Sequence, residues 1–276
     1  MKRKKRSIPH RVRDILIFLI TILGIARMYR RWAKKNGPLV RVLVFHDVHD
    51  REWFELMMET LTKHYHVITP EDFHAKHFHP NRINVLVTFD DGYASWETAV
   101  QSVFKENELR GLFFINSALM DVAHNGEWVE LFMRERLLIS PRAPLTWEGV
   151  QKLHDAGHTI GGHSLTHPNL TNLSEEDMVR EILDDKHTIE RHLNTILTDF
   201  AYPFGTRAHV SEAVCESVQA SGYFHGYTTV SRFVDFDEPF SIPRTCIENE
   251  STPHELKRWV GGGYDLFVIL KDICVR

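Results

Sequence analysis

The sequence has 276 residues, of which 43% are hydrophobic and 25% charged, with 15 Gly, 11 Pro and 3 Cys. This composition is ordinary for a folded globular protein and excludes collagen-like, low-complexity and disulfide-framework proteins. Residues 1–40 hold 12 of the 33 Lys and Arg residues and a single acid, a net charge of +11, so the remaining residues carry −15. Because the folded part is acidic, we expect no nucleic acid partner.

The basic arm contains an apolar run of 12 residues at 15–26, ILIFLITILGIA. This run is shorter than the ~20 residues that cross a bilayer comfortably, and arginines follow it where a signal peptide would have a cleavage site. Three interpretations stay open: an uncleaved signal-anchor, an interfacial helix on anionic lipids, or a helix packed on the folded domain. We expect residues 1–36 to associate with the membrane. Lys and Arg flank the run on both sides, so they favour an outward-facing domain at the inner membrane only weakly.

From residue 40 onward, short apolar segments alternate with helical ones. Strands are predicted at 40–48, 83–89, 111–116, 158–163 and 199–205. Helices are predicted at 51–65, 95–108, 145–158, 174–193 and 209–222. Near-continuous apolar strands between helices indicate a parallel sheet covered on both faces, so we expect one α/β domain over 40–276. Residues 117–144 fit this alternation poorly and are predicted to form an insertion beside the site.

Two adjacent carboxylates follow the predicted strand 83–89, in TFDDGY at 88–93. The carboxyl ends of parallel strands face the ligand crevice, so Asp90 and Asp91 lie where chemistry is expected. Asp-Gly is also a common turn signal, and alone this motif is more often a solvated turn.

A second motif, GGHSLTHPNL at 161–170, places His163 and His167 four residues apart. Catalytic zinc sites use three protein ligands, and two imidazoles with one carboxylate satisfy that number. A His-x-x-x-His spacing is more often coincidental in a chain with 18 His. A further five histidines between 64 and 79 suit a solvated rim better than a metal site.

The third motif is AYPFG at 201–205, which alone indicates only a turn. The three motifs in this order, each at the exit of a predicted strand, resemble the polysaccharide deacetylases of the NodB-homology group, carbohydrate esterase family 4. The resemblance runs from about residue 40 to 244. It implies a distorted (β/α) barrel and metal-dependent N-deacetylation of a GlcNAc-type sugar. The apolar run at 15–26, outside the resemblance, adds the expectation of an N-terminal anchor helix.

The resemblance also implies a role for each motif residue. Asp90 corresponds to the general base that activates a water molecule on the metal, and Asp91, His163 and His167 to the metal ligands. Phe204 lies where the family offers a backbone N–H to the oxyanion. Zinc is the expected ion, and cobalt, nickel or iron suit the same ligands.

The sequence departs from the commoner pattern at two places. Ala201 stands where the family often has an arginine that orients the base, and the C-terminal part lacks the Leu-x-His that often supplies the general acid. A branch that includes the poly-N-acetylglucosamine deacetylases carries an early strand ending in a His-Asp-Val motif, which FHDV at 45–48 matches, so His46 is the candidate acid. Arg244 is a candidate replacement for the missing arginine, and with Tyr93 it is a weaker candidate for substrate binding.

We therefore expect a membrane-associated, metal-dependent deacetylase of an N-acetylated glycan or lipid-linked sugar. Two alternatives stay open. One is a deformylase or amidase acting on a lipid-linked aminosugar with the same site. The other is a non-catalytic, glycan-binding member of the same fold.

Overall fold

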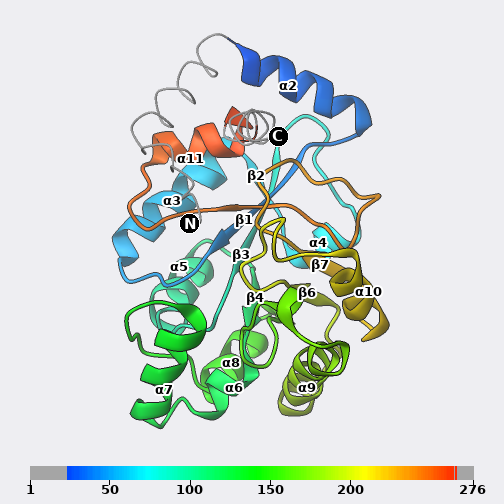
Figure 1. Ribbon diagram of the computed structural model, residues 1–276. Helices are drawn as coiled ribbons and strands as arrows, with labels where there is room; N and C mark the ends of the chain where they lie inside the picture. Colours follow the sequence, from blue (N-terminus) through cyan, green and yellow to red (C-terminus); the bar gives the residue numbers. More distant parts are fainter. Residues whose placement is uncertain (1–23, 264, 266–276) are drawn as a thin grey trace, which may run out of the picture.

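Eight parallel strands form one curved sheet in the computed structural model, which describes residues 24–263 and 265 (Figure 1). The strands are β1 (Val40–Phe45), β2 (His66–Val67), β3 (Asn84–Phe89), β4 (Leu112–Ile115), β5 (Thr159–Gly162), β6 (Asp199–Ala201), β7 (His225–Tyr227) and β8 (Arg244–Cys246). Their order is β7-β6-β5-β4-β3-β1-β8, and β2 pairs with the start of β3. Strand β1 pairs along one edge of β3. Strands β2 and β4 therefore share the other edge of β3.

The two ends of this sheet approach each other and nearly close it into a barrel. Tyr227 of β7 forms a parallel bridge with Ile242, two residues before β8, and the Thr228 N–H donates to the Ile242 carbonyl at 2.8 Å. The Arg244 Nε then donates to the Thr228 carbonyl at 3.0 Å. The expected α/β barrel is thus confirmed as a nearly closed ring of parallel strands.

Apolar side chains fill both sides of the strands, which explains why the strand sequences are almost continuously apolar. All six residues of β1 and of β3 are buried. One buried cluster takes alternate strand positions such as Val40, Val42 and Leu86, while Leu43 and Val87 belong to a larger cluster with the surrounding helices. Alternating side chains point to opposite faces of a strand, so one set packs inside the barrel and the other beneath the helices.

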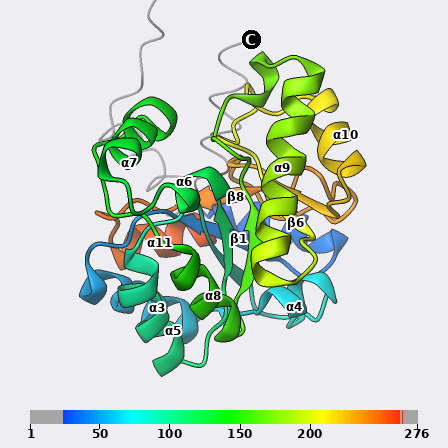
Figure 2. The ribbon, with the colours of Figure 1, turned by 90° about the horizontal axis from the view of Figure 1, so that it is seen from below.

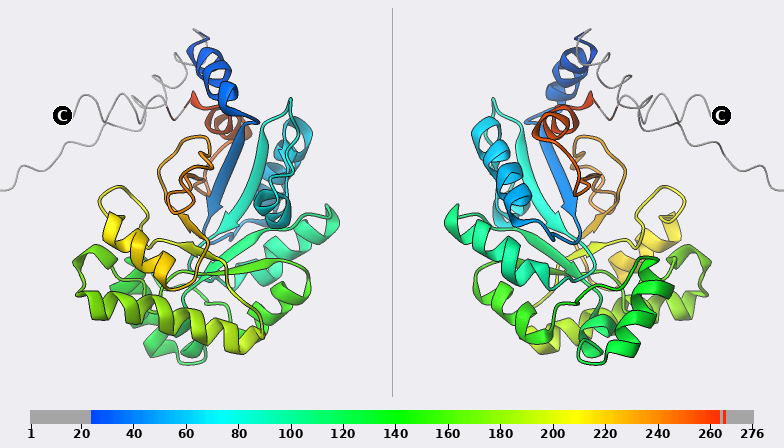
Figure 3. Two further views of the ribbon diagram at one scale, coloured as in Figure 1. Left: turned by 90° about the vertical axis from the view of Figure 1, so that its right-hand side faces the viewer. Right: turned by 90° about the vertical axis from the view of Figure 1, so that its left-hand side faces the viewer.

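Helices surround the strands in the views of Figures 2 and 3. They are α2 (Ile25–Ala33), α3 (Arg51–His64), α4 (Pro70–His74), α5 (Gln101–Glu106), α6 (Ser117–Asp121), α7 (Gly126–Phe132), α8 (Trp147–Asp155), α9 (Glu175–Leu193), α10 (Glu212–Ala220) and α11 (Pro253–Val260), with single turns η1 (Lys34–Asn36), η2 (Trp96–Val100), η3 (Met133–Leu137) and η4 (Leu170–Asn172). Side-chain caps begin α3, α8, α9 and α10, where Asp50, Thr146, Ser174 and Ser211 accept a backbone N–H of the first turn.

The predicted helices and strands are present, most of them one to four residues shorter than expected. Residues 117–144 form α6, α7 and η3, and residues 137–142 of this segment reach the pocket described below. Elements β2, α4, β7, β8 and α11 were not predicted. The three strands among them have only two or three residues, too few to show a periodicity.

The N-terminal arm is described only from Gly24 onward, so most of the apolar run 15–26 and the expected anchor helix lie outside the described residues. Within the described part, no helix is both long and apolar enough to span a bilayer. Helix α2 packs beside α11 (Figure 1), with Arg30 Nη1 donating to the Gly261 carbonyl at 2.7 Å and Tyr29 stacked on Phe233.

Candidate active site

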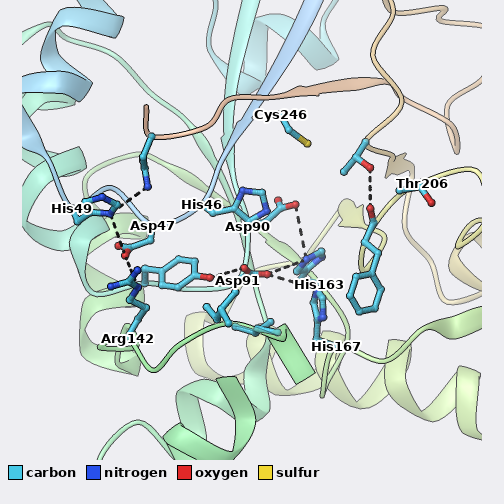
Figure 4. Close-up of a pocket in the computed structure, with 16 residues that line it drawn as sticks. His46, Asp47, His49, Asp90, Asp91, Arg142, His163, His167, Thr206 and Cys246 are labelled. Carbon is cyan, nitrogen blue, oxygen red and sulfur yellow. Dashed lines mark hydrogen bonds and ion pairs between the residues drawn. The ribbon is translucent and has the colours of Figure 1, made fainter. Parts of the chain in front are cut away.

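The carboxyl ends of the strands surround a pocket of about 520 Å³ (Figure 4). Three predicted motifs reach it from the turns after β3, β5 and β6, and the turn after β1 adds a fourth group of residues. The lining residues are His46, Asp47, His49, Asp90, Asp91, Tyr93, Leu137, Ile139, Arg142, His163, His167, Phe204, Thr206, Thr229, Cys246 and Asn249. The parallel topology therefore brings together residues that lie up to 203 positions apart in the sequence.

Asp91, His163 and His167 place their ligand atoms close enough for one metal ion. Asp91 Oδ1 lies 3.5 Å from His163 Nε2 and 3.7 Å from His167 Nε2, and the three side chains are buried. Their ligand atoms all lie within 4.8 Å of one another. Two imidazole nitrogens and one carboxylate oxygen are the donor set of many catalytic zinc sites, so these residues fit a zinc-type ion.

Neighbouring groups orient each of these ligands. His163 Nδ1 lies 2.7 Å from the Ala201 carbonyl, an arrangement that puts the proton on Nδ1 and leaves Nε2 free to bind a metal. The Tyr93 hydroxyl donates to Asp91 Oδ2 at 2.8 Å. Burial lowers the pKa of His167 to about 4, so this imidazole is neutral at neutral pH, as a metal ligand must be.

Asp90 lies beside this group and binds a buried arginine. Arg244 Nη1 and Nη2 contact Asp90 Oδ1 and Oδ2 at 2.6 and 2.7 Å, and both side chains are almost fully buried. Burial disfavours the charged Asp90 carboxylate, but the Arg244 guanidinium outweighs it and holds the pKa of Asp90 below its ordinary value. Asp90 is thus a carboxylate kept ionised inside the protein, 3.9 Å from His163 Nε2.

Four residues of these turns have left-handed backbone conformations that are uncommon outside glycine. They are Asp91, Ser164, His167 and Phe204, with φ between 56° and 84°. Such strain persists only where the surrounding contacts stabilise it; here Ser164 Oγ accepts the His167 N–H at 3.1 Å. Strained backbone of this kind is typical of functional sites.

The remaining predicted residues occupy different places around the pocket. His46 is exposed, follows β1 and lies beside Asp90 in Figure 4. Phe204 lines the pocket with its ring against His167, and within the described residues its backbone N–H has no hydrogen-bond partner. Tyr93 lines the pocket but directs its hydroxyl to Asp91. Arg244 is fully buried behind Asp90 and does not line the pocket, so its placement supports the orienting role over contact with substrate.

One supporting residue was missed by the sequence reasoning. Asp185 of α9 is fully buried, and its carboxylate accepts the backbone N–H groups of Ser117 at 2.9 Å and His163 at 3.1 Å. Burial raises its pKa to about 7. The signal was present, because Asp185 falls between Ile182 and Ile189 on the apolar face of this amphipathic helix.

Charged residues on the pocket rim were also missed. Asp47 accepts from Ser95 Oγ at 2.8 Å and pairs with Arg142 at 3.5 Å. Arg142 comes from the segment 117–144, whose last residues are attached to the turn after β3 by the Ala94 N–H, which donates to the Ala143 carbonyl. The insertion therefore contributes one wall of the pocket.

Comparisons with known proteins agree with this site. The sequence model described as polysaccharide deacetylase matches residues 79–224, which is more than half of the chain. The YxkH protein of Bacillus subtilis is 22% identical over 210 residues, which cover 72% of this chain and 67% of that protein. Peptidoglycan-N-acetylmuramic acid deacetylase PdaA of Bacillus subtilis is 27% identical over 153 residues, which cover 55% of this chain and 48% of that protein. The matched region contains the three motifs and leaves out His46 and Arg244.

Solved structures share the fold at low sequence identity. The deacetylase PplD of Streptococcus pyogenes aligns with a TM-score of 0.68 and 17% identity, over 81% of this chain and 99% of that chain. IcaB of Ammonifex degensii aligns with a TM-score of 0.65 and 20% identity, over 83% of this chain and 98% of that chain. These distant matches do not separate the poly-N-acetylglucosamine branch from the rest of the family.

Proposed function

Because the chain belongs to the polysaccharide deacetylase family, we propose that it removes the acetyl group from an N-acetylated sugar by metal-dependent hydrolysis. The arrangement of Asp91, His163 and His167 beside an ionised Asp90 is the main support. Relatives named as deacetylases of peptidoglycan and of chitin agree with a glycan substrate.

The residues present fit a divalent ion, held by Asp91 Oδ1 and the Nε2 atoms of His163 and His167. We propose zinc, although two imidazoles and a carboxylate also accept cobalt, nickel or iron. When bound, such an ion supplies a Lewis acid that polarises the acyl oxygen and lowers the pKa of water.

Asp90 acts as the general base in this proposal. Its carboxylate is ionised and lies next to the ligand set, where it takes the proton of the attacking water. Arg244 fixes the orientation of both carboxylate oxygens, and it replaces the arginine that the family often carries where this chain has Ala201. A base held in one geometry loses little entropy on reaching the transition state.

Two further groups complete the hydrolysis. Among residues 24–263 and 265, the Phe204 N–H has no hydrogen-bond partner, and Phe204 lines the pocket, so this N–H is suited to the oxyanion of the tetrahedral intermediate. His46, on the side of Asp90, gives a proton to the departing amine. The C–N bond then breaks, acetate forms and the amino sugar leaves. This use of an early-strand histidine is what supports the poly-N-acetylglucosamine-type branch.

The test is acetate release from N-acetylglucosamine oligomers by the full chain, after chelation and re-addition of zinc or cobalt. Asp90→Asn is expected to abolish release, and Asp184→Asn, an exposed carboxylate on α9, is the matched control. Because Asp90→Asn leaves Arg244 buried without its partner, folding of the variant is checked by circular dichroism. Release of formate but not acetate from paired lipid-linked aminosugars would identify a deformylase. Glycan binding without any turnover would identify a non-catalytic member.

We also propose that the N-terminal arm attaches the enzyme to a membrane, with the pocket on the outer side. Helix α2 turns Ile25, Met28 and Trp32 toward solvent, with exposed fractions of 40, 69 and 63%, while Tyr29 and Arg30 contact the barrel. Exposed apolar side chains at this spacing, flanked by arginines, favour the interfacial interpretation of the arm.

A further inference from the structure

A second group of metal-ligating side chains lies at the opposite end of the barrel from the pocket. His74 is the last residue of α4, and Asp199 and His225 are the first residues of β6 and β7. Because the strands are parallel, their first residues lie at the end remote from the turns that carry Asp90 and Asp91. We propose that His74, Asp199 and His225 form a second, structural site for a zinc-type divalent ion.

The geometry of the cluster suits one ion. Asp199 Oδ1 lies 2.9 Å from His74 Nε2 and 3.3 Å from His225 Nδ1, and the ligand atoms all lie within 4.8 Å of one another. Asp199 is fully buried, whereas about a quarter of each imidazole side chain is exposed. Solvent can therefore supply the remaining ligand of a tetrahedral site.

The hydrogen bonds inside the cluster leave one nitrogen without a partner. Asp199 Oδ1 has two lone pairs, and the Tyr227 hydroxyl at 2.7 Å and His74 Nε2 at 2.9 Å occupy both. His225 Nδ1 is buried 3.3 Å from the same oxygen but makes no hydrogen bond to any residue in the described part of the chain. An unpaired buried ring nitrogen next to a carboxylate is costly. A cation removes that cost when it accepts one lone pair each from His74 Nε2, Asp199 Oδ1 and His225 Nδ1.

The surroundings also match those of a metal site. Thr198 Oγ1 donates to Asp199 Oδ2 at 2.6 Å, so both carboxylate oxygens are oriented by hydroxyl groups. The two imidazoles stack with centroids 4.6 Å apart, a distance at which two charged rings would repel. Metals bind neutral imidazoles, so the ion would take the place of the proton that His74 Nε2 shares with Asp199. Two nitrogens with one oxygen select zinc or its neighbours over calcium or magnesium.

The proposed ion would join α4 to the sheet. Helix α4 has only five residues and lies between β2 and β3. Strand β2 pairs with β3 alone, so this part of the chain has few backbone bonds to the rest of the sheet. A bond from His74 to β6 and β7 closes a loop of more than a hundred residues, so it stabilises the fold without contacting the pocket. The site shares no residue with the catalytic group.

The test counts metal ions in the full-length protein. After chelation, zinc is titrated against a chromophoric chelator and the bound metal is measured by mass spectrometry. We expect two equivalents in the wild type and one in each of His163→Ala, His74→Gln and His225→Gln. His77→Gln, at an exposed histidine near the end of α4, is the control and keeps two.

A second measurement follows the stability of the fold instead of the number of bound ions. In His163→Ala, the one remaining zinc is expected to raise the melting temperature, and this shift disappears when His74→Gln is added. A wild type that binds one equivalent, lost in His163→Ala and retained in His74→Gln, would overturn the proposal. So would a second equivalent that survives both His74→Gln and His225→Gln.

Discussion

Arg244 binds both carboxylate oxygens of Asp90 across 154 positions of the sequence. The contact joins the first residue of β8 to the turn after β3, although β1 separates these strands in the sheet. Arg244 also contacts the Thr228 carbonyl beyond β7, so the same side chain helps to close the barrel. The proposed base is therefore oriented by the residue at the seam of the barrel.

Replacing Arg244 by lysine is expected to lower kcat by about 100-fold with little change in KM. A lysine keeps the charge but lacks the planar pair of N–H groups that fixes both oxygens, and a shift of about 1 Å in a catalytic group costs about that much. Steady-state kinetics of acetate release measure the effect, with Arg232→Lys at a half-exposed ion pair as the control. A rise in KM at constant kcat would instead indicate that Arg244 contacts the substrate.

His46→Gln is expected to lower the rate of amide hydrolysis by about 100-fold or more while leaving ester hydrolysis nearly unchanged. An amine must be protonated to leave, whereas 4-nitrophenolate leaves without a proton, so only the amide requires the general acid. Parallel assays with an N-acetylated sugar and 4-nitrophenyl acetate separate the two steps. Equal losses on both substrates would argue against His46 as the acid.

Tyr93→Phe is expected to weaken metal binding by about tenfold, because it removes the hydroxyl that orients Asp91 and keeps the ring in the core. A competition titration with a chromophoric chelator measures the affinity. Tyr65→Phe, whose hydroxyl bonds the Lys257 carbonyl, is the control. Unchanged metal affinity with a raised KM would favour the substrate-binding role predicted from the sequence.

The main strands and the turn motifs could be predicted from the sequence because they depend on local signals. Strands β1 and β3 are nearly continuous apolar runs. Asp90 and Asp91 follow β3 directly, and the histidine motif begins where the short strand β5 ends. The parallel topology then brings their turns to one end of the barrel.

The contacts that complete the site depend on pairings that no local pattern records. Strand β8 has three residues and shows no periodicity, so only the resemblance to the family made Arg244 a candidate for orienting the base. The role of His74 could not be predicted from local sequence either. Its neighbours in the sequence suggested only a solvated rim, and its partners Asp199 and His225 lie more than a hundred residues away. Long-range pairs of this kind follow from the closure of the barrel.

The double variant Met28→Ser and Trp32→Ser is expected to weaken binding to phosphatidylglycerol vesicles by about tenfold or more. Each buried apolar side chain contributes roughly 1.5–3 kcal/mol to such contacts. Co-sedimentation of the full chain measures the binding, and Ile196→Ser, at a residue 78% exposed, is the control. Equal binding of the variant and the wild type would show that α2 does not contact the membrane.

His158 is expected to make the fold less stable in mild acid. Burial lowers its pKa to about 4, and the Gly111 N–H donates to Nδ1, so the folded protein holds the neutral ring. The unfolded chain has an ordinary pKa near ~6.5 and binds the proton first, so the free energy of unfolding falls as the pH drops from ~6.5 toward ~4. The loss between about pH 7 and about pH 5 amounts to about 2 kcal/mol.

Urea unfolding at several pH values tests this slope. In His158→Asn, the side-chain oxygen can still accept the Gly111 N–H. The loss of unfolding free energy between about pH 7 and about pH 5 is expected to be smaller than in the wild type by about 2 kcal/mol. The lost contacts with Phe104 and Phe113 lower stability equally at every pH. His77→Asn, at an exposed histidine, is expected to keep the wild-type slope. If His158→Asn and the wild type lose stability in parallel as the pH falls, His158 is not the group responsible.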